Sequence, residues 1–188
     1  MKIFLAFIIC VFFVACQNKN NNPQVTIITD LGNIELELYK NQAPKTVAAF
    51  IANVDAGMYK NTTFYRVLKN EDLDIQSNYG IIQGGIWPNK KKLLGIVHES
   101  TNQTGLSHTS GTISFARANG ELATSEFFIC IGEQTLFNEG NASPDDKKGF
   151  AAFGKVMSGM DVVRKIQDQK NNGDMFTKPI KIKDVERN

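Results

Sequence analysis

The sequence predicts a mainly β domain, an antiparallel barrel of about eight short strands with one helix early and one late. Short segments that alternate apolar and polar residues recur along the chain, with turn residues between them, as is typical of strands joined by hairpins. Two other segments place apolar residues at helical spacing. Short strands in this arrangement favour a barrel capped by the two helices.

The first 15 residues are predicted to be a signal peptide that precedes the folded domain. Lys2 supplies a positive charge, and residues 3–14 are almost continuously apolar, but a membrane-spanning helix needs about 20 residues. Ala15 before Cys16 resembles the lipobox of bacterial lipoproteins, in which that cysteine carries the lipid. An ordinary secretory signal cleaved nearby is the alternative. Lipidation at Cys16 implies an extracytoplasmic protein, anchored to a bacterial membrane through a flexible tether over residues 16–23.

One domain is expected over residues 24–188. Without its first 15 residues the chain keeps 188 − 15 = 173 residues, with 21 − 1 = 20 basic and 19 acidic side chains. A domain of this size buries about 70% of its chain surface on folding. A near-neutral chain without a basic cluster argues against nucleic acid as a partner. We expect the protein to be a monomer.

The cysteines and histidines give little sign of a metal site. Of the three cysteines only Cys130 lies in the expected domain, where we expect a buried, inert thiol and no disulfide. His98 and His108 are the only histidines and are expected to be structural. Without paired Cys or His spacing, a zinc site is not expected.

The domain opens with a hairpin and a helix. Residues 25–29 and 34–38 alternate as strands do, and residues 30–33 supply the turn. Pro44 then suits the first turn of a helix, which carries one apolar stripe and ends at Gly57.

The later elements follow the same pattern. Loops are predicted over residues 69–77 and 138–148, and residues 98–108 are rich in turn-forming residues. A second helix is expected from Ser158 to Gln169. The remaining strands are predicted over residues 64–68, 81–83, 112–117, 127–131, 150–156 and 180–185.

An arginine interrupts one of these apolar strands. Arg66 follows Phe64 and Tyr65, and Gln83 with the pair Gly84-Gly85 comes later. A charged group in a strand is costly to bury unless it is paired or used. Taken alone, Arg66 would be a surface arginine with its stem packed on the barrel.

Several ordered blocks resemble the cyclophilin family of peptidyl-prolyl cis-trans isomerases. They are residues 64–67 with 83–85, 111–117 with 125–130, and 153–156 with 159–163. The resemblance covers nearly all of residues 25–185. It implies an eight-stranded antiparallel barrel with a helix over each end and a substrate groove on its outer face. It also implies isomerisation of X-Pro bonds in proline-containing segments of unfolded or exported client proteins, assisting their folding.

The resemblance implies that Arg66 is the catalytic group and that Gln83 orients it. Twisting a peptide bond meets a barrier of ~18–20 kcal/mol and breaks no bond, so the reaction needs no nucleophile, metal or cofactor. The twisted prolyl nitrogen regains a lone pair, to which a fixed guanidinium can donate only in the transition state. The other implied substrate-binding residues, with Phe128 leading the proline pocket, are Phe64, Ile81, Phe115, Ala116, Arg117, Ala118, Glu126, Phe128, Leu136, Phe137 and Phe150.

The chain departs from the family pattern in several places. The segment from Arg66 to Gln83 is longer than usual, and Gly80 stands where the family has a phenylalanine that Tyr79 could replace. Arg117 and Glu126 replace an asparagine and a glutamine. Leu136 stands where eukaryotic members carry a tryptophan important for cyclosporin binding, so cyclosporin binding is left open.

These departures suggest three hypotheses. Arg117 and Glu126 would pair across the groove, or Glu126 would pair with Arg66 and slow turnover. Residues 69–77 would overhang the groove and select extended or basic substrates.

Two other functions remain as alternatives. One is a non-catalytic proline-peptide binder or holdase chaperone that uses the same groove. The other is a small-ligand-binding β-barrel lipoprotein, which needs an open interior, whereas eight strands enclose little more than side chains.

Overall fold

The computed structural model describes residues 21–69, 79–86, 93–141 and 145–188. The expected signal peptide, Cys16 and most of the 69–77 loop lie outside these residues.

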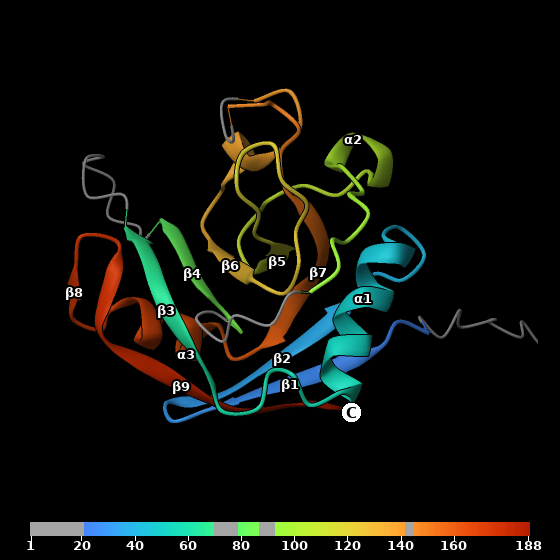
Figure 1. Ribbon diagram of the computed structural model, residues 1–188. Helices are drawn as coiled ribbons and strands as arrows, with labels where there is room; N and C mark the ends of the chain where they lie inside the picture. The colour runs from blue at the N-terminus through green and yellow to red at the C-terminus, as the bar shows by residue number, and fades with distance from the viewer. Residues whose placement is uncertain (1–20, 70–78, 87–92, 142–144) are drawn as a thin grey trace, which may run out of the picture.

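Eight strands close into an antiparallel barrel, as predicted (Figure 1). Their order around the barrel is β1-β2-β7-β5-β6-β4-β3-β9, and β1 pairs with β9 to complete the ring. A two-residue strand, β8, adds a short hairpin beside β9. The bounds are β1 Gln24–Thr29, β2 Gly32–Leu38, β3 Thr62–Lys69, β4 Gly80–Gly85, β5 Thr112–Phe115, β6 Phe127–Ile131, β7 Ala151–Ser158, β8 Asn171–Asn172 and β9 Met175–Arg187.

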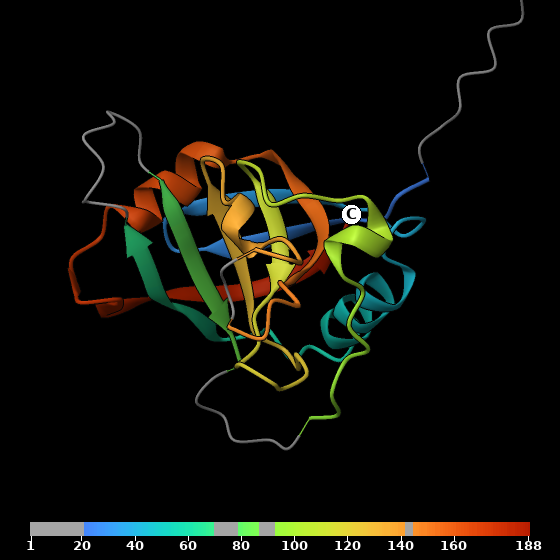
Figure 2. The ribbon, with the colours of Figure 1, turned by 90° about the horizontal axis from the view of Figure 1, so that it is seen from above.

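Two helices pack against the barrel, and Figures 1 and 2 show them well apart. Helix α1 (Pro44–Asp55) begins at its proline, and α3 (Met160–Gln167) buries Val163 and Ile166. The structure adds two short turns that were not predicted, α2 (Thr101–Thr104) and the 3-10 turn η1 (Thr135–Phe137). Within the described residues, none of the helices has the length and apolar character to cross a bilayer.

The barrel interior is filled by aromatic and aliphatic side chains. Phe50 of α1 lies 5.1 Å from Phe153 and 5.9 Å from Phe127, and Phe115 stacks on Phe153 at 4.9 Å between ring centres. All four side chains are fully buried. This packing contradicts the alternative of a barrel that holds a small ligand in its interior.

A β-bulge in β3 prepares the outer face for the site. Phe64 pairs with Gly84 and Arg66 pairs with Gln83, so Tyr65 is an extra residue on its strand. An extra residue lets two successive side chains lie on one face, although strand side chains otherwise alternate. Phe64 and Val67 therefore enter the core, while Tyr65 and Arg66 both face outward.

Candidate active site

A groove of about 580 Å³ lies on the outer face of the barrel, within the range of roughly 300–1,000 Å³ that ligand sites occupy. It runs over the outward side chains of β3, β4 and β6 and the segments that follow β5 and precede β7. The lining residues are Arg66, Leu68, Ile81, Gln83, Ala116, Arg117, Ala118, Glu121, Leu122, Thr124, Glu126, Phe128, Phe137 and Phe150.

Two acceptors hold the Arg66 guanidinium, one from strand β4 and one from the turn that precedes β9. Nη1 donates to Oε1 of Gln83 at 3.0 Å, and Nε donates to Oδ2 of Asp174 at 2.7 Å. The Arg66 side chain is 34% exposed, so it stays accessible from the groove. Its hydrogen bond holds the pKa of Asp174 below the usual range.

Gln83 is the first link in a chain of hydrogen bonds that runs away from Arg66. Its Nε2 donates to the Tyr65 hydroxyl at 2.8 Å, and that hydroxyl donates to Oε2 of Glu126 at 2.7 Å. Burial, followed by the negative charge of Glu126, raises the pKa of Tyr65, so the phenol stays protonated. Because the hydroxyl gives its only proton to Glu126, it must accept from Gln83.

Gly85 makes room for this chain. Its φ of 147° lies in a region that L side chains rarely adopt. A Cβ there would lie 2.7 Å from the Glu126 carboxylate. The second glycine of the Gly84-Gly85 pair therefore lets Glu126 approach β4.

An apolar pocket lies beside Arg66. The rings of Phe128, Phe137 and Phe150 meet edge to face, with centres 5.3–5.4 Å apart. With Ile81 and the buried thiol of Cys130, they form an apolar cluster separate from the barrel core. Burial raises the pKa of Cys130, as expected of an inert thiol.

His108 supports the back of this pocket. Its ring stacks on Phe128 at 5.8 Å, while Nδ1 lies 2.7 Å from Oδ1 of Asn138 and Nε2 lies 3.0 Å from Oγ of Ser114. Burial lowers the pKa of His108 to about 4, so the ring is neutral at pH 7. These contacts give His108 a structural place behind the aromatic wall.

Three of the expected substrate-binding residues lie elsewhere. Phe64 and Phe115 are fully buried in the barrel core, where Phe64 packs against Phe127 at 5.8 Å. Their expected place in the groove wall is corrected, because the β-bulge at Tyr65 leaves Phe64 on the inner face and alternation along β5 turns Phe115 inward beside Ile113. Leu136 is 61% exposed and is not among the residues that line the groove.

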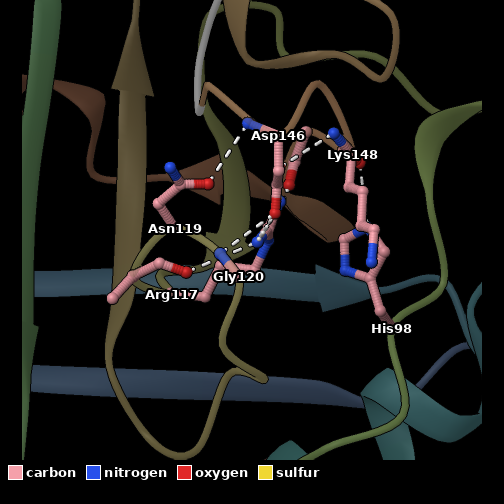
Figure 3. Close-up of polar contacts among 8 residues, drawn as sticks. His98, Arg117, Asn119, Gly120, Asp146 and Lys148 are labelled. Atoms are coloured by element: carbon pink, nitrogen blue, oxygen red, sulfur yellow. Dashed lines mark hydrogen bonds and ion pairs between the residues drawn. The ribbon is translucent and has the colours of Figure 1, made fainter.

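Arg117 lines the groove but binds Asp146 rather than Glu126 (Figure 3). Nη1 and Nη2 each donate to one Asp146 oxygen at 2.7 Å, and Nε donates to the Gly149 carbonyl at 2.9 Å. The Arg117 side chain is only 3% exposed, and its guanidinium lies 5.9 Å from the Phe150 ring centre. The hypothesis that Arg117 pairs with Glu126 is wrong, since Arg117 instead ties the segment after β5 to the segment before β7.

The structure also explains why a glycine occupies position 80. Gly80 has a φ of 138°, and a Cβ there would collide with the Leu68 carbonyl oxygen. A phenylalanine does not fit this backbone. Tyr79 packs over Gly132 and is not among the groove-lining residues, so it does not take the place of that phenylalanine.

Sequence reasoning missed seven residues of this site. Leu68, Glu121, Leu122 and Thr124 also line the groove, while Tyr65, Asp146 and Asp174 hold its charged groups. Strand alternation could have predicted that Leu68 faces outward, because Leu68 lies two residues after Arg66 on the same strand. In the described part of the chain, no three His, Cys, Asp or Glu side chains are grouped to hold a metal ion.

Fold and site together define a class of protein, a closed β-barrel that presents a fixed guanidinium beside an aromatic pocket on its outer face. A family model described as cyclophilin type peptidyl-prolyl cis-trans isomerase/CLD matches residues 24–187. The chain belongs to this family and is therefore a peptidyl-prolyl cis-trans isomerase.

Individual relatives support the same family assignment. A peptidyl-prolyl cis-trans isomerase of Acinetobacter baylyi is 41% identical over 77% of this chain and 72% of its own length. Peptidyl-prolyl cis-trans isomerase B of Escherichia coli is 33% identical over 76% of this chain and 83% of its own. A crystal structure of a Cryptosporidium parvum cyclophilin shares the fold with a TM-score of 0.70 at 24% identity, covering 89% of this chain and 98% of that one.

Proposed function

We propose that the groove isomerises X-Pro bonds of unfolded or exported proteins outside the cytoplasm, with Arg66 as the catalytic group. The observation that carries this proposal is the Arg66 guanidinium, fixed by Gln83 and Asp174 beside an apolar pocket. The proline ring would occupy the pocket, and the guanidinium would face the twisting bond.

The chemistry follows from this placement. As the peptide bond rotates, the prolyl nitrogen becomes a hydrogen-bond acceptor, so donation from Arg66 stabilises the transition state more than the ground state. A hydrogen bond from a charged donor contributes about 1.5–3 kcal/mol, or roughly tenfold to a hundredfold in rate. The rest would come from holding the peptide in the groove.

Phe128, Phe137, Phe150 and Ile81 would bind the proline ring. They form an apolar surface within the groove that Arg66 also lines. A second structure of the Cryptosporidium parvum cyclophilin, determined in the presence of an Ala-Pro dipeptide, also matches this chain with a TM-score of 0.69. It supports a proline-containing peptide as the ligand of this fold.

The anchor is a separate part of the proposal. Cys16 would carry the lipid and residues 17–23 would tether the domain to a bacterial membrane, on its periplasmic side or at the cell surface, as the lipobox-like Ala15-Cys16 pair indicates.

The isomerisation rate of a short Ala-Pro peptide tests the catalytic assignment. Arg66→Ala is expected to lower kcat/KM at least about tenfold, because the charge-assisted donor is lost. Arg187→Ala is the matched control, since Arg187 is also exposed and paired with an aspartate, Asp55, at 3.2 Å. It should keep the wild-type rate.

A different result would favour the non-catalytic alternative. If the wild-type domain binds proline peptides without accelerating their isomerisation, the groove is a recognition site. If Arg66→Ala keeps full activity, Arg66 is not the catalytic group.

A further inference from the structure

Arg66 lies between two neighbours that each supply one acceptor, strand β4 and the turn that leads into β9. On the β4 side the acceptor is Gln83, which pairs with Arg66 directly across the ladder. On the other side Arg66 pairs with Met175, the first residue of β9, and the preceding Asp174 bonds to its Nε. Asp174 is not among the groove-lining residues.

The turn that carries Asp174 is fixed to β3. Asn172 pairs with Met175, so Gly173 and Asp174 form a two-residue loop, and Gly173 has the positive φ of 57° that such loops favour. The Asp174 carbonyl accepts from the Val67 N–H at 2.8 Å. Backbone and carboxylate of Asp174 therefore bind consecutive residues of β3. Figure 1 shows β8 and the start of β9 beside β3.

The two acceptors use only part of the guanidinium. Arginine carries five N–H donors in a rigid plane. Asp174 takes the Nε–H and Gln83 takes one Nη1–H. Contacts at two different nitrogens fix both the position and the tilt of the plane, and the N–H groups that these two bonds do not use can face the substrate.

We propose that Asp174 is a positioning residue that holds the Arg66 guanidinium ready for the transition state. This inference rests on the proposed catalytic role of Arg66. A long, 34% exposed arginine samples many rotamers, and restricting them before the peptide binds removes an ordering cost from the reaction. Asp174 therefore acts on turnover rather than on binding of the peptide.

The test compares Asp174→Ala and Asp174→Glu with Asp55→Ala. Asp55 is a matched control because it also pairs with an arginine at the surface, at 50% exposure against 47% for Asp174. Asp174→Ala is expected to lower kcat about fivefold, with the dissociation constant of a proline peptide within about twofold of wild type. Asp174→Glu should restore part of the rate, since it keeps the charge.

An NMR signal can report directly on whether the Arg66 guanidinium is held in place. The Arg66 Nε–H should give a resolved, exchange-protected ¹⁵N–¹H resonance in the wild type and in Asp55→Ala, and it should broaden or vanish in Asp174→Ala. In an Arg66→Ala background, Asp174→Ala should cause no additional loss of rate, because the two residues act as one unit.

The outcomes separate the two proposals. Full activity of Asp174→Ala, a faster variant, or an equal loss in Asp55→Ala would overturn the role of Asp174 while leaving Arg66 catalytic. Full activity of Arg66→Ala would overturn the catalytic assignment and the positioning role together.

Discussion

Tyr65 determines which way the Gln83 amide faces. The Tyr65 hydroxyl donates to Glu126 and accepts from Nε2 of Gln83, so Oε1 of Gln83 must face Arg66. Glu126 is thus linked to the Arg66 guanidinium through two intermediate side chains. The hypothesis that Glu126 affects turnover remains a prediction and gains this physical route.

Replacing Tyr65 with phenylalanine tests whether the hydrogen-bond chain from Glu126 through Tyr65 and Gln83 affects Arg66. Tyr65→Phe is expected to lower kcat/KM about tenfold, because Gln83 loses its orienting partner, and to lower the free energy of unfolding by about 1–3 kcal/mol. Steady-state isomerisation and urea denaturation measure the two effects.

Glu126→Gln and Tyr59→Phe are the controls for this variant. The amide oxygen that Glu126→Gln introduces can still accept from Tyr65, so a rate closer to wild type than that of Tyr65→Phe is expected. Tyr59→Phe removes a buried hydroxyl that donates to the Ser125 carbonyl at 3.1 Å inside the barrel. It should cost stability with little change in kcat/KM; an equal rate loss in both tyrosine variants would count against the route. A Glu126→Gln enzyme faster than wild type would instead support a restraining role for Glu126.

At the residue scale, the local sequence pattern predicted which way a side chain points better than it predicted which residue that side chain binds. Alternation requires Phe127 and Phe128 to lie on opposite faces, and the family resemblance made Phe128 the outward one, as the structure has it. The same alternation, applied to β5, would have turned Phe115 inward beside Ile113. The partners Asp146 and Asp174 lie 29 and 108 residues from the arginines they bind, and no local pattern predicts pairings over such separations.

At the scale of elements, the Arg117–Asp146 pair connects two segments of the groove wall. Asp146 also accepts from the Gly120 N–H at 3.1 Å, and its own N–H donates to Asn119, so both sides of the contact are fixed (Figure 3). The segment before β7 also carries Gly149, bonded to Arg117, and Phe150. The position of the Phe150 ring in the apolar pocket is therefore expected to depend on this ion pair.

Asp146→Asn tests this dependence. The buried Arg117 would lose its ionised partner, so we expect a lower thermal midpoint and a higher KM for the Ala-Pro peptide, with a smaller effect on kcat. Calorimetry and isomerisation kinetics measure these changes. Asp145→Asn, in the same loop, is the control and should match wild type. Unchanged KM and thermal midpoint would contradict the role given to the pair.

The stabilisation that the Arg117–Asp146 pair gives to the fold should depend on pH in a defined direction. The hydrogen bond from Arg117 holds the pKa of Asp146 far below its ordinary value of 3.8. A carboxyl group with a lowered pKa stabilises the fold above its ordinary pKa, and that stabilisation is lost as the pH falls through the lowered value. The difference in stability between wild type and Asp146→Asn should therefore be constant from about pH 5 to pH 8.

Most elements were predictable because their apolar periodicity is strong. The hairpin of β1 and β2, the proline start of α1 and the last helix all follow the pattern of the sequence. Helix α2 was missed because four residues carry no helical period, although Ser100 and Gln103 cap it. The bulge at Tyr65 was missed because a one-residue insertion depends on the partner strand.

At the scale of the whole molecule, the anchor proposal predicts where the protein is found. In bacterial cells that produce the full chain, the protein should partition with membranes and incorporate labelled palmitate, whereas Cys16→Ala should do neither. Cys10→Ala is the control and should behave as the wild type, because Cys10 lies inside the expected signal peptide. A soluble, unlabelled wild-type protein would favour the ordinary secretory signal.

The pairing of β1 with β9, which closes the barrel, has a consequence for an enzyme that acts on extended peptide chains. An open sheet presents a row of unpaired N–H and C=O groups, onto which any extended segment can add as a further strand and start aggregation. Because β1 pairs with both β2 and β9, the eight-stranded ring leaves no such edge. A peptide bound in the groove would therefore not compete for the hydrogen bonds that keep the barrel folded.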